Sequence, residues 1–173
     1  MKTLYLICIL GTMSFNSFSQ EKKSSMSSKV TTYYFIRHAE KDRSNPQERN
    51  PHLNENGLKR AENWKVILDN IKFDAIYATD YYRTIETAKP TAESNNLKVI
   101  IYDPNDINNP EAFLKATEGK TVLVVGHSNT TPAFVNAVLG HKKYENMEDD
   151  NNGNLYIVTI IDGTASDQVL HIN

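Results

Sequence analysis

Two histidines in this sequence lie one residue beyond runs of apolar residues. His38 comes shortly after the run 33–36, and His127 lies just beyond the run 122–125. The carboxyl ends of parallel strands meet at one edge of an open α/β sheet, and such sheets bind their ligands at that edge. We therefore expect both imidazoles at one site, where a neutral imidazole can act as a nucleophile.

Two arginines accompany the histidines. Arg37 immediately precedes His38, and Arg83 ends the loop 80–83, which follows a further short predicted strand. Guanidinium groups hold phosphate oxygens through paired N–H donors, and phosphoryl transfer depends chiefly on positioning and charge stabilisation. Together these residues predict a phosphoryl site in which one imidazole attacks phosphorus while the arginines and the second imidazole hold its oxygens.

Strands that alternate with helices are expected to position these groups. Aromatic and β-branched runs between polar loops predict strands at residues 32–36, 74–78, 98–102 and 121–125. Helices are expected after the cap residue Asn54, from about residue 81, over 110–117, and over 131–139 before Gly140. The run 121–125 lacks polar alternation and is expected to be a central strand buried on both faces.

Finer patterns complete the predicted fold. The first helix has apolar residues at steps of three and four, which predict one buried face: Leu58, Ala61, Trp64, Leu68 and Ile71. Pro90 is expected to kink or divide the second helix. Segments 155–161 and 168–172, joined by Asp162-Gly163, predict an antiparallel pair at a sheet edge. The fold class is therefore α/β, with three layers: a mostly parallel sheet, helices on both faces, and an antiparallel edge pair.

The first 19 residues differ from the rest. Lys2 is their only charge, 4–10 is almost wholly apolar, and small residues precede Gln20. This pattern predicts a secretory signal peptide at 1–19, cleaved near Ser19, and a periplasmic or secreted protein with no stable membrane insertion after cleavage. A buried N-terminal helix is the alternative. Cleavage would remove the only cysteine, Cys8.

Composition limits the remaining chain. The 20–30 segment is rich in serine and lysine and is expected to be a disordered spacer before one domain at 31–173. The 173-residue chain is 39% hydrophobic and has a formal charge of −2, so nothing predicts a nucleic-acid surface. Oligomeric state is left open, because no heptad or long apolar patch is visible.

The motifs, in this order, resemble those of the histidine phosphatase (phosphoglycerate mutase-like) superfamily, in its small branch 1 type, over about 32–139. The family's Arg-His-Gly marker is Arg37-His38-Ala39 here, its Arg-x-x-x-Thr-Ala pattern is 83–88, and its second histidine fits Gly126-His127-Ser128. The resemblance implies that His38 is the phosphorylated nucleophile. It also implies that Arg37, Arg83 and His127 bind the phosphoryl group, and that Ala39 is tolerated unless its φ is positive.

The proton donor to the leaving group is less well defined. Family members of this branch commonly use a glutamate after the third strand, where this chain has Asp103. Asp106 and Glu40 are alternatives, and Glu40 can instead pair with Lys41, Arg37 or Arg83. Without a carboxylic acid at the leaving oxygen, only substrates with good leaving groups would react quickly.

Further binding residues are predicted near the two histidines. Lys41, with Arg43 and Arg49, is placed to bind a second anionic group of the substrate, unless this loop is simply solvated. Ser128 and Asn129 lie near a predicted helix start, where backbone amides attract anions.

The expected activity is hydrolysis of small phosphorylated substrates through a phosphohistidine. Short loops after the second and third strands predict an open site, which favours hydrolysis over mutase chemistry. A phosphomutase and a non-catalytic phosphate- or sugar-phosphate-binding protein are the alternatives, and the presence of His38 favours an enzyme. No cofactor or metal is expected, because the histidines lack the tight spacing of metal ligands.

Overall fold

The computed structural model describes residues 29–172, apart from the side chain of Asp106. Its six-stranded sheet has the order β3-β2-β4-β1-β5-β6. Four strands are parallel: β1 (Val30–Arg37), β2 (Ala75–Ala78), β3 (Val99–Ile101) and β4 (Thr121–Gly126). β5 (Asn154–Ile161) pairs antiparallel with β1, and β6 (Thr164–His171) pairs antiparallel with β5. The predicted signal peptide and nearly all of the predicted spacer lie outside the described residues.

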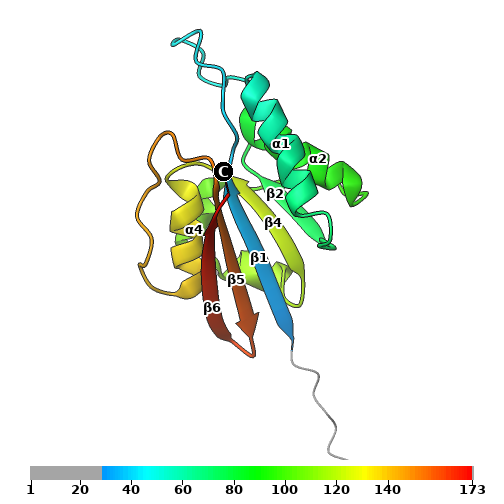
Figure 1. The fold of residues 1–173 in the computed structure, drawn as a ribbon. Helices are drawn as coiled ribbons and strands as arrows, with labels where there is room; N and C mark the ends of the chain where they lie inside the picture. The colour runs from blue at the N-terminus through cyan, green and yellow to red at the C-terminus, as the bar shows by residue number, and fades with distance from the viewer. Residues whose placement is uncertain (1–28, 173) are drawn as a thin grey trace, which may run out of the picture.

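Helices cover both faces of this sheet (Figure 1). α1 (Glu55–Ile67) and α2 (Tyr82–Ser94) lie on one face, and α4 (Thr130–Leu139) lies on the other with the short α3 (Glu111–Ala116). The 3₁₀ helix η1 (Pro104–Asn108) precedes α3. No helix within residues 29–172 has the length and apolar character that crossing a membrane requires. The predicted three-layer α/β fold is confirmed.

Side-chain alternation along the central strands builds the two cores. Tyr33 and Phe35 of β1 face α4, together with Val122 and Val124 of β4. Ile36 of β1 and Leu123 and Val125 of β4 point the other way, toward α1 and α2. Both faces of β1 and β4 are therefore buried, as the unbroken apolar run of β4 predicts.

The buried face of α1 differs by one residue from the predicted face. Leu58 is 53% exposed, and the helix buries Gly57, Ala61 and Trp64 instead. A Cβ on Gly57 would lie 2.1 Å from the carbonyl oxygen of Glu40. The helix therefore turns its glycine toward the chain just after β1, and this close approach moves Leu58 outward.

Two further elements depart from the sequence prediction. α2 is not divided at Pro90, because buried residues on both sides of the proline, including Ala88 and Ala92, pack as one helix. β6 begins at Thr164 rather than at residue 168. Asp162 and Gly163 both have positive φ and form a two-residue turn, so pairing starts at once with Ile161 opposite Thr164.

Candidate active site

The four residues predicted around the phosphoryl group converge at the carboxyl edge of the parallel strands. Arg37 ends β1, His38 follows it, and His127 follows β4. The imidazole rings of His38 and His127 lie 5.3 Å apart between centroids, in an edge-to-face arrangement. Arg83, in the first turn of α2, places Nη2 3.4 Å from Nδ1 of His127. One edge of the sheet thus gathers two imidazoles and two guanidinium groups.

The imidazole of His38 is held with one nitrogen free to react. Its Nδ1 lies 2.7 Å from the carbonyl oxygen of Ala39, which can only accept, so Nδ1 carries the proton and Nε2 carries the lone pair. Burial, reinforced by the nearby His127, Arg83 and Arg37, lowers the pKa of His38 from the usual 6.5 to about 3. His38 is therefore a neutral, oriented nucleophile at physiological pH.

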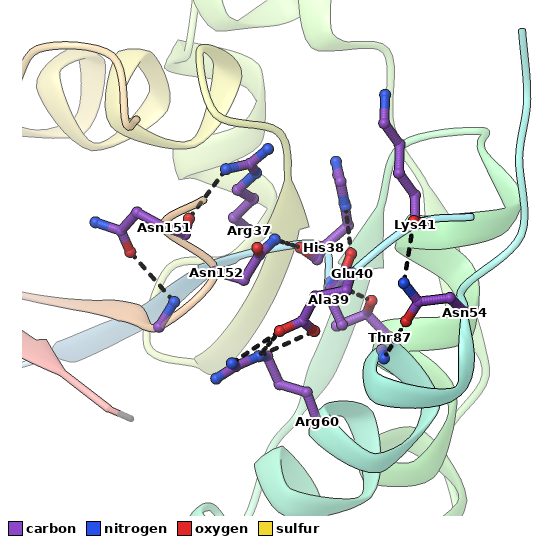
Figure 2. A network of polar contacts seen from close by, with 12 residues as sticks. Arg37, His38, Ala39, Glu40, Lys41, Asn54, Arg60, Thr87, Asn151 and Asn152 are labelled. Carbon is purple, nitrogen blue, oxygen red and sulfur yellow. Dashed lines mark hydrogen bonds and ion pairs between the residues drawn. The ribbon is translucent and has the colours of Figure 1, made fainter. Parts of the chain in front are cut away.

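The main chain around His38 is fixed by two neighbouring segments. Its amide donates to the carbonyl oxygen of Gly126 at 2.9 Å, which ties the residue to the end of β4. Its carbonyl oxygen accepts a 2.8 Å hydrogen bond from Nδ2 of the buried Asn152 (Figure 2). These two bonds, one on each side of the Cα of His38, fix the main chain that carries the imidazole.

Thr87 explains why a threonine follows the arginine by four residues in the α2 motif. Its hydroxyl donates to the carbonyl oxygen of Arg83, one helical turn earlier, and accepts from the amide of Ala39 at 2.9 Å. The same hydroxyl therefore joins the start of α2 to the residue after the nucleophile. Ala39 is fully buried, and the positive-φ residues other than glycine in 29–172 are Asn96 and Asp162, so an alanine fits there without strain.

The hydroxyl of Thr79 determines the tautomer of His127. The Thr84 hydroxyl donates to backbone carbonyls, so it accepts the proton of Thr79, whose oxygen then accepts from Nε2–H of His127 at 2.8 Å. Nδ1 of His127 consequently presents a lone pair toward Arg83. Burial, reinforced by the charge of Arg83, lowers the pKa of His127 to about 4, so the free protein holds it neutral.

Arg83, which lies beside His127, has N–H donors that bind no acceptor in the described part of the chain. The ring of Tyr81 lies under its guanidinium carbon, 4.3 Å from the centroid, and packs edge-to-face against His127. Nε and Nη1 of Arg83 are buried and have no hydrogen-bond partner within the described part of the chain. Buried N–H groups of a cation without acceptors are suited to an anionic ligand.

Arg37 is bound on one side by the segment that precedes β5. Its Nη1 donates to the carbonyl oxygens of Glu148, Asp149 and Asn151, at 2.9, 3.0 and 3.1 Å. Nη2 donates to Oδ1 of Asp149 at 3.1 Å, whereas Nε, also buried, has no partner among residues 29–172. Arg37 therefore anchors this segment as well as facing the site.

A cavity of about 600 Å³ opens beside His38. It is lined by the loop after β1, including Lys41 and Arg43, and by the acidic residues 148–150. Partial burial and the nearby Arg83 and Arg43 lower the pKa of Lys41. Three cations, Arg37, Lys41 and Arg43, line this cavity together with acidic side chains, whereas Arg83 and His127 do not line it. Figure 2 shows the side chains of Arg37, His38 and Lys41 extending to the same side of the loop.

Two of the candidate acids, Asp103 and Glu40, are bound by other groups of the chain. Oδ1 of the exposed Asp103 accepts from the amide of Asn105 at the start of η1, and Asp103 does not line the cavity. Glu40 points away from His38 in Figure 2, and Arg60 of α1 binds its carboxylate at 2.8 and 3.0 Å. The expected partners of Glu40, Lys41 among them, are therefore replaced by Arg60. The side chain of Asp106 is not among those that the structure describes.

The predicted helix-start residues contribute through the main chain. The carbonyl oxygen of Ser128 accepts from the amide of Met147, and Asn129 is the N-cap of α4 without a side-chain capping bond. Neither residue lines the cavity. Among the residues that sequence reasoning missed, Thr79, Asp149 and Asn152 contact the site directly. For Asp149 and Asn152 the signal was topological: residues before an antiparallel strand lie at the same edge as residues after its parallel neighbours. Thr79 directly follows the parallel strand β2, so its position in the sequence already placed it at this edge.

The depressed pKa values of the two histidines predict a loss of stability in acid. Unfolded histidine titrates near 6.5, whereas folded His38 and His127 titrate at about 3 and about 4, so below pH 6.5 the unfolded chain binds more protons. The free energy of unfolding is expected to fall as pH decreases from 6.5 toward 4, by at most about 1.4 kcal/mol per pH unit for each histidine. Urea unfolding across this range measures the slope. A His38→Gln/His127→Gln double variant with an equally steep slope would contradict the expectation.

Comparisons with known proteins give one family match and several similar folds. Residues 33–104 match the model of the histidine phosphatase superfamily (branch 1). The fold is similar to that of the protein histidine phosphatase SixA solved with tungstate, with a TM-score of 0.64 and 16% identity over 81% of this chain and 96% of that chain. It is also similar to phosphoglycerate mutase from Bacillus anthracis, with a TM-score of 0.63 and 18% identity over 83% and 93% of the two chains. A mycobacterial glucosyl-3-phosphoglycerate phosphatase gives a TM-score of 0.61 and 15% identity over 83% and 100%. No curated protein matches the sequence.

Proposed function

We propose that this chain, whose residues 33–104 match the model of the histidine phosphatase superfamily (branch 1), hydrolyses phosphomonoesters through a phosphohistidine formed on His38. The observation that carries the proposal is the state of His38: its Nδ1 is bonded to the Ala39 carbonyl, and its free Nε2 lies among cations. A neutral imidazole with a fixed lone pair beside unused guanidinium donors is suited to attack a bound phosphoryl group.

The proposed reaction has two displacements. The phosphoryl group binds to the free N–H donors of Arg83 and Arg37, and Nε2 of His38 attacks phosphorus in line while the bond to the leaving oxygen breaks. Water then attacks the phosphohistidine, which releases inorganic phosphate and restores neutral His38. A phosphoryl dianion raises the proton affinity of His127, because a nearby negative charge favours the imidazolium. Protonated at Nδ1, His127 becomes a donor to the phosphoryl oxygens.

Hydrolysis is favoured over transfer to a second substrate because water can enter the site. The side chains of Arg43 and Asp149, both at the cavity, are 56% and 73% exposed. A mutase must instead protect its phosphohistidine from water. We therefore propose a phosphatase that acts on small phosphorylated substrates and requires no metal or cofactor.

The leaving-group dependence tests this function. Asp103 is the acid that the sequence suggests, but its carboxylate accepts from the Asn105 amide and does not line the cavity, so we expect poor protonation of the leaving oxygen. We expect the chain to hydrolyse 4-nitrophenyl phosphate in excess EDTA, with kcat exceeding that for an alkyl phosphate by about a hundredfold, because a poor leaving group needs protonation. Asp103→Asn is expected to leave the aryl phosphate rate unchanged. Turnover that requires an added metal ion would contradict the proposal.

We also propose that the protein is exported, on the composition of residues 1–19. Expression of the full chain in a bacterial host, followed by fractionation and N-terminal sequencing, is expected to yield a periplasmic or secreted protein beginning at Gln20. Intact protein confined to the cytoplasm would contradict export and would leave the catalytic proposal unaffected.

A further inference from the structure

Only one edge of the Arg37 guanidinium is available to an anion. Nη1 is fully used by the three main-chain carbonyl oxygens of the segment 148–151. The remaining edge consists of Nη2 and Nε, which together match two oxygens of a phosphate or carboxylate. Nε has no partner within residues 29–172, while Nη2, which carries two N–H donors, donates one of them to Oδ1 of Asp149. An internal carboxylate therefore lies at one of the two nitrogens that a bidentate anion would use.

Asp149 is bound in the way that a small anion would be. Its Oδ1 lies 3.1 Å from Nη2 of Arg37, and its Oδ2 lies 2.8 Å from Nη2 of Arg43. Hydrogen bonds from Arg43 and Arg37 lower the pKa of Asp149, so the side chain is an anion at neutral pH. Its side chain is 73% exposed and that of Arg37 only 3%, so the carboxylate rather than the arginine is free to move.

We propose that Asp149 is a binding residue of the site that competes with the substrate: its carboxylate holds Nη2 of Arg37 in the free enzyme and must be displaced when a phosphoryl group binds. The identity of the displacing ligand rests on the proposed phosphatase function. Rotation of the Asp149 side chain is sufficient for displacement, because the three main-chain bonds to Nη1 keep the segment in place.

Competition between Asp149 and the substrate has a measurable effect on ligand affinity. Displacing the carboxylate adds one fixed cost to the binding of every phosphoryl ligand, substrate and product alike. Asp149 therefore raises KM for phosphomonoesters and the dissociation constant for inorganic phosphate by the same factor. Exposed ion pairs and charge-assisted hydrogen bonds of this type correspond to a factor of roughly three to ten.

The test replaces Asp149 with asparagine, which keeps the shape and removes the charge. Steady-state kinetics with 4-nitrophenyl phosphate and calorimetric binding of inorganic phosphate are measured on the same preparations. We expect Asp149→Asn to lower KM and the phosphate dissociation constant together, by roughly three- to tenfold, with kcat unchanged or lower. Asp149→Ala should lower both at least as much, because it removes the acceptor entirely.

Asp150→Asn is the matched control, because it makes the same chemical change at the next residue, in the lining of the same cavity. It is expected to change both quantities less than twofold. Equal effects of the two variants would show that any loss of negative charge near the cavity strengthens phosphate binding, and this would overturn the proposal. Unchanged or weaker phosphate binding by Asp149→Asn would also overturn it. So would a loss of kcat confined to alkyl phosphates, since Asp149 would then be the acid.

The proposed phosphatase function can fail independently of the proposed role of Asp149. If the wild-type chain binds phosphate and does not turn over aryl phosphates, the proposed function is wrong. The calorimetric comparison of Asp149→Asn with Asp150→Asn still decides whether Asp149 competes for Arg37.

Discussion

Replacing His38 with glutamine is expected to lower kcat for 4-nitrophenyl phosphate by about a thousandfold or more, the range seen when a nucleophile is removed. Glutamine can still donate an N–H to the Ala39 carbonyl, which His38 contacts through Nδ1. It offers no basic nitrogen to phosphorus, so the covalent intermediate cannot form. Initial rates in excess EDTA measure the loss.

A measurement of phosphate binding shows whether His38→Gln has lost only its nucleophile or also the structure of the binding site. Arg37, Arg83 and His127 are untouched, so His38→Gln should bind inorganic phosphate within a few-fold of the wild type. His141→Gln is the matched control, since His141 is exposed and its Nδ1 bonds only the nearby Leu139 carbonyl. It is expected to retain full activity. Substantial turnover by His38→Gln would contradict the assigned nucleophile.

Gly57→Ala is expected to lower the free energy of unfolding by about 3 kcal/mol, the upper part of the range for overpacking. An exposed helical glycine would gain stability from this change. Here the new Cβ would lie 2.1 Å from the Glu40 carbonyl oxygen and 3.0 Å from its nitrogen and carbonyl carbon. These are main-chain atoms, so α1 and the loop after β1 would have to separate.

The same displacement is expected to reduce activity, because Glu40 is two residues from His38. The free energy of unfolding, measured with urea, and kcat/KM should therefore both be lower in Gly57→Ala than in the wild type. Asn56→Ala, an exposed neighbour in the same helical turn, is the control and should change stability by less than about 0.5 kcal/mol. Wild-type stability of Gly57→Ala would show that the contact between α1 and the Glu40 main chain does not constrain the loop.

Apolar runs were sufficient to predict the elements that carry the four central groups. The run before His38 and the run before His127 are buried on both faces, and their short length and their aromatic and β-branched residues favour a strand over a buried helix. Because parallel strands end at one edge, the convergence of Arg37, His38, Arg83 and His127 followed from the order of the strands alone.

Local spacing could not predict contacts that depend on close approach. The steps of three and four in α1 fit a face centred on Leu58 as well as one centred on Gly57. The contact of Gly57 with the Glu40 main chain decides between them. A glycine in an otherwise apolar helical pattern is a signal of such an approach only when the partner segment is known.

The segment 148–152 was missed for a topological reason. It follows no parallel strand, and its acidic composition is typical of a solvated loop. It reaches the site because β5 runs antiparallel to β1, so the residues before β5 lie beside the residues after β1. Asn152 then binds the His38 carbonyl, and Asp149 binds Arg37. Strand direction, rather than residue type, places these two side chains.

The most direct test of the proposed mechanism is to locate the phosphoryl group during turnover. The chain is mixed with 4-nitrophenyl phosphate in EDTA, quenched in alkali and digested, and the peptides are analysed by mass spectrometry. An acid-labile phosphoryl group is expected on His38 and is expected to be absent from His38→Gln. Turnover with no phosphorylated peptide, or with the phosphoryl group on another residue, would contradict it.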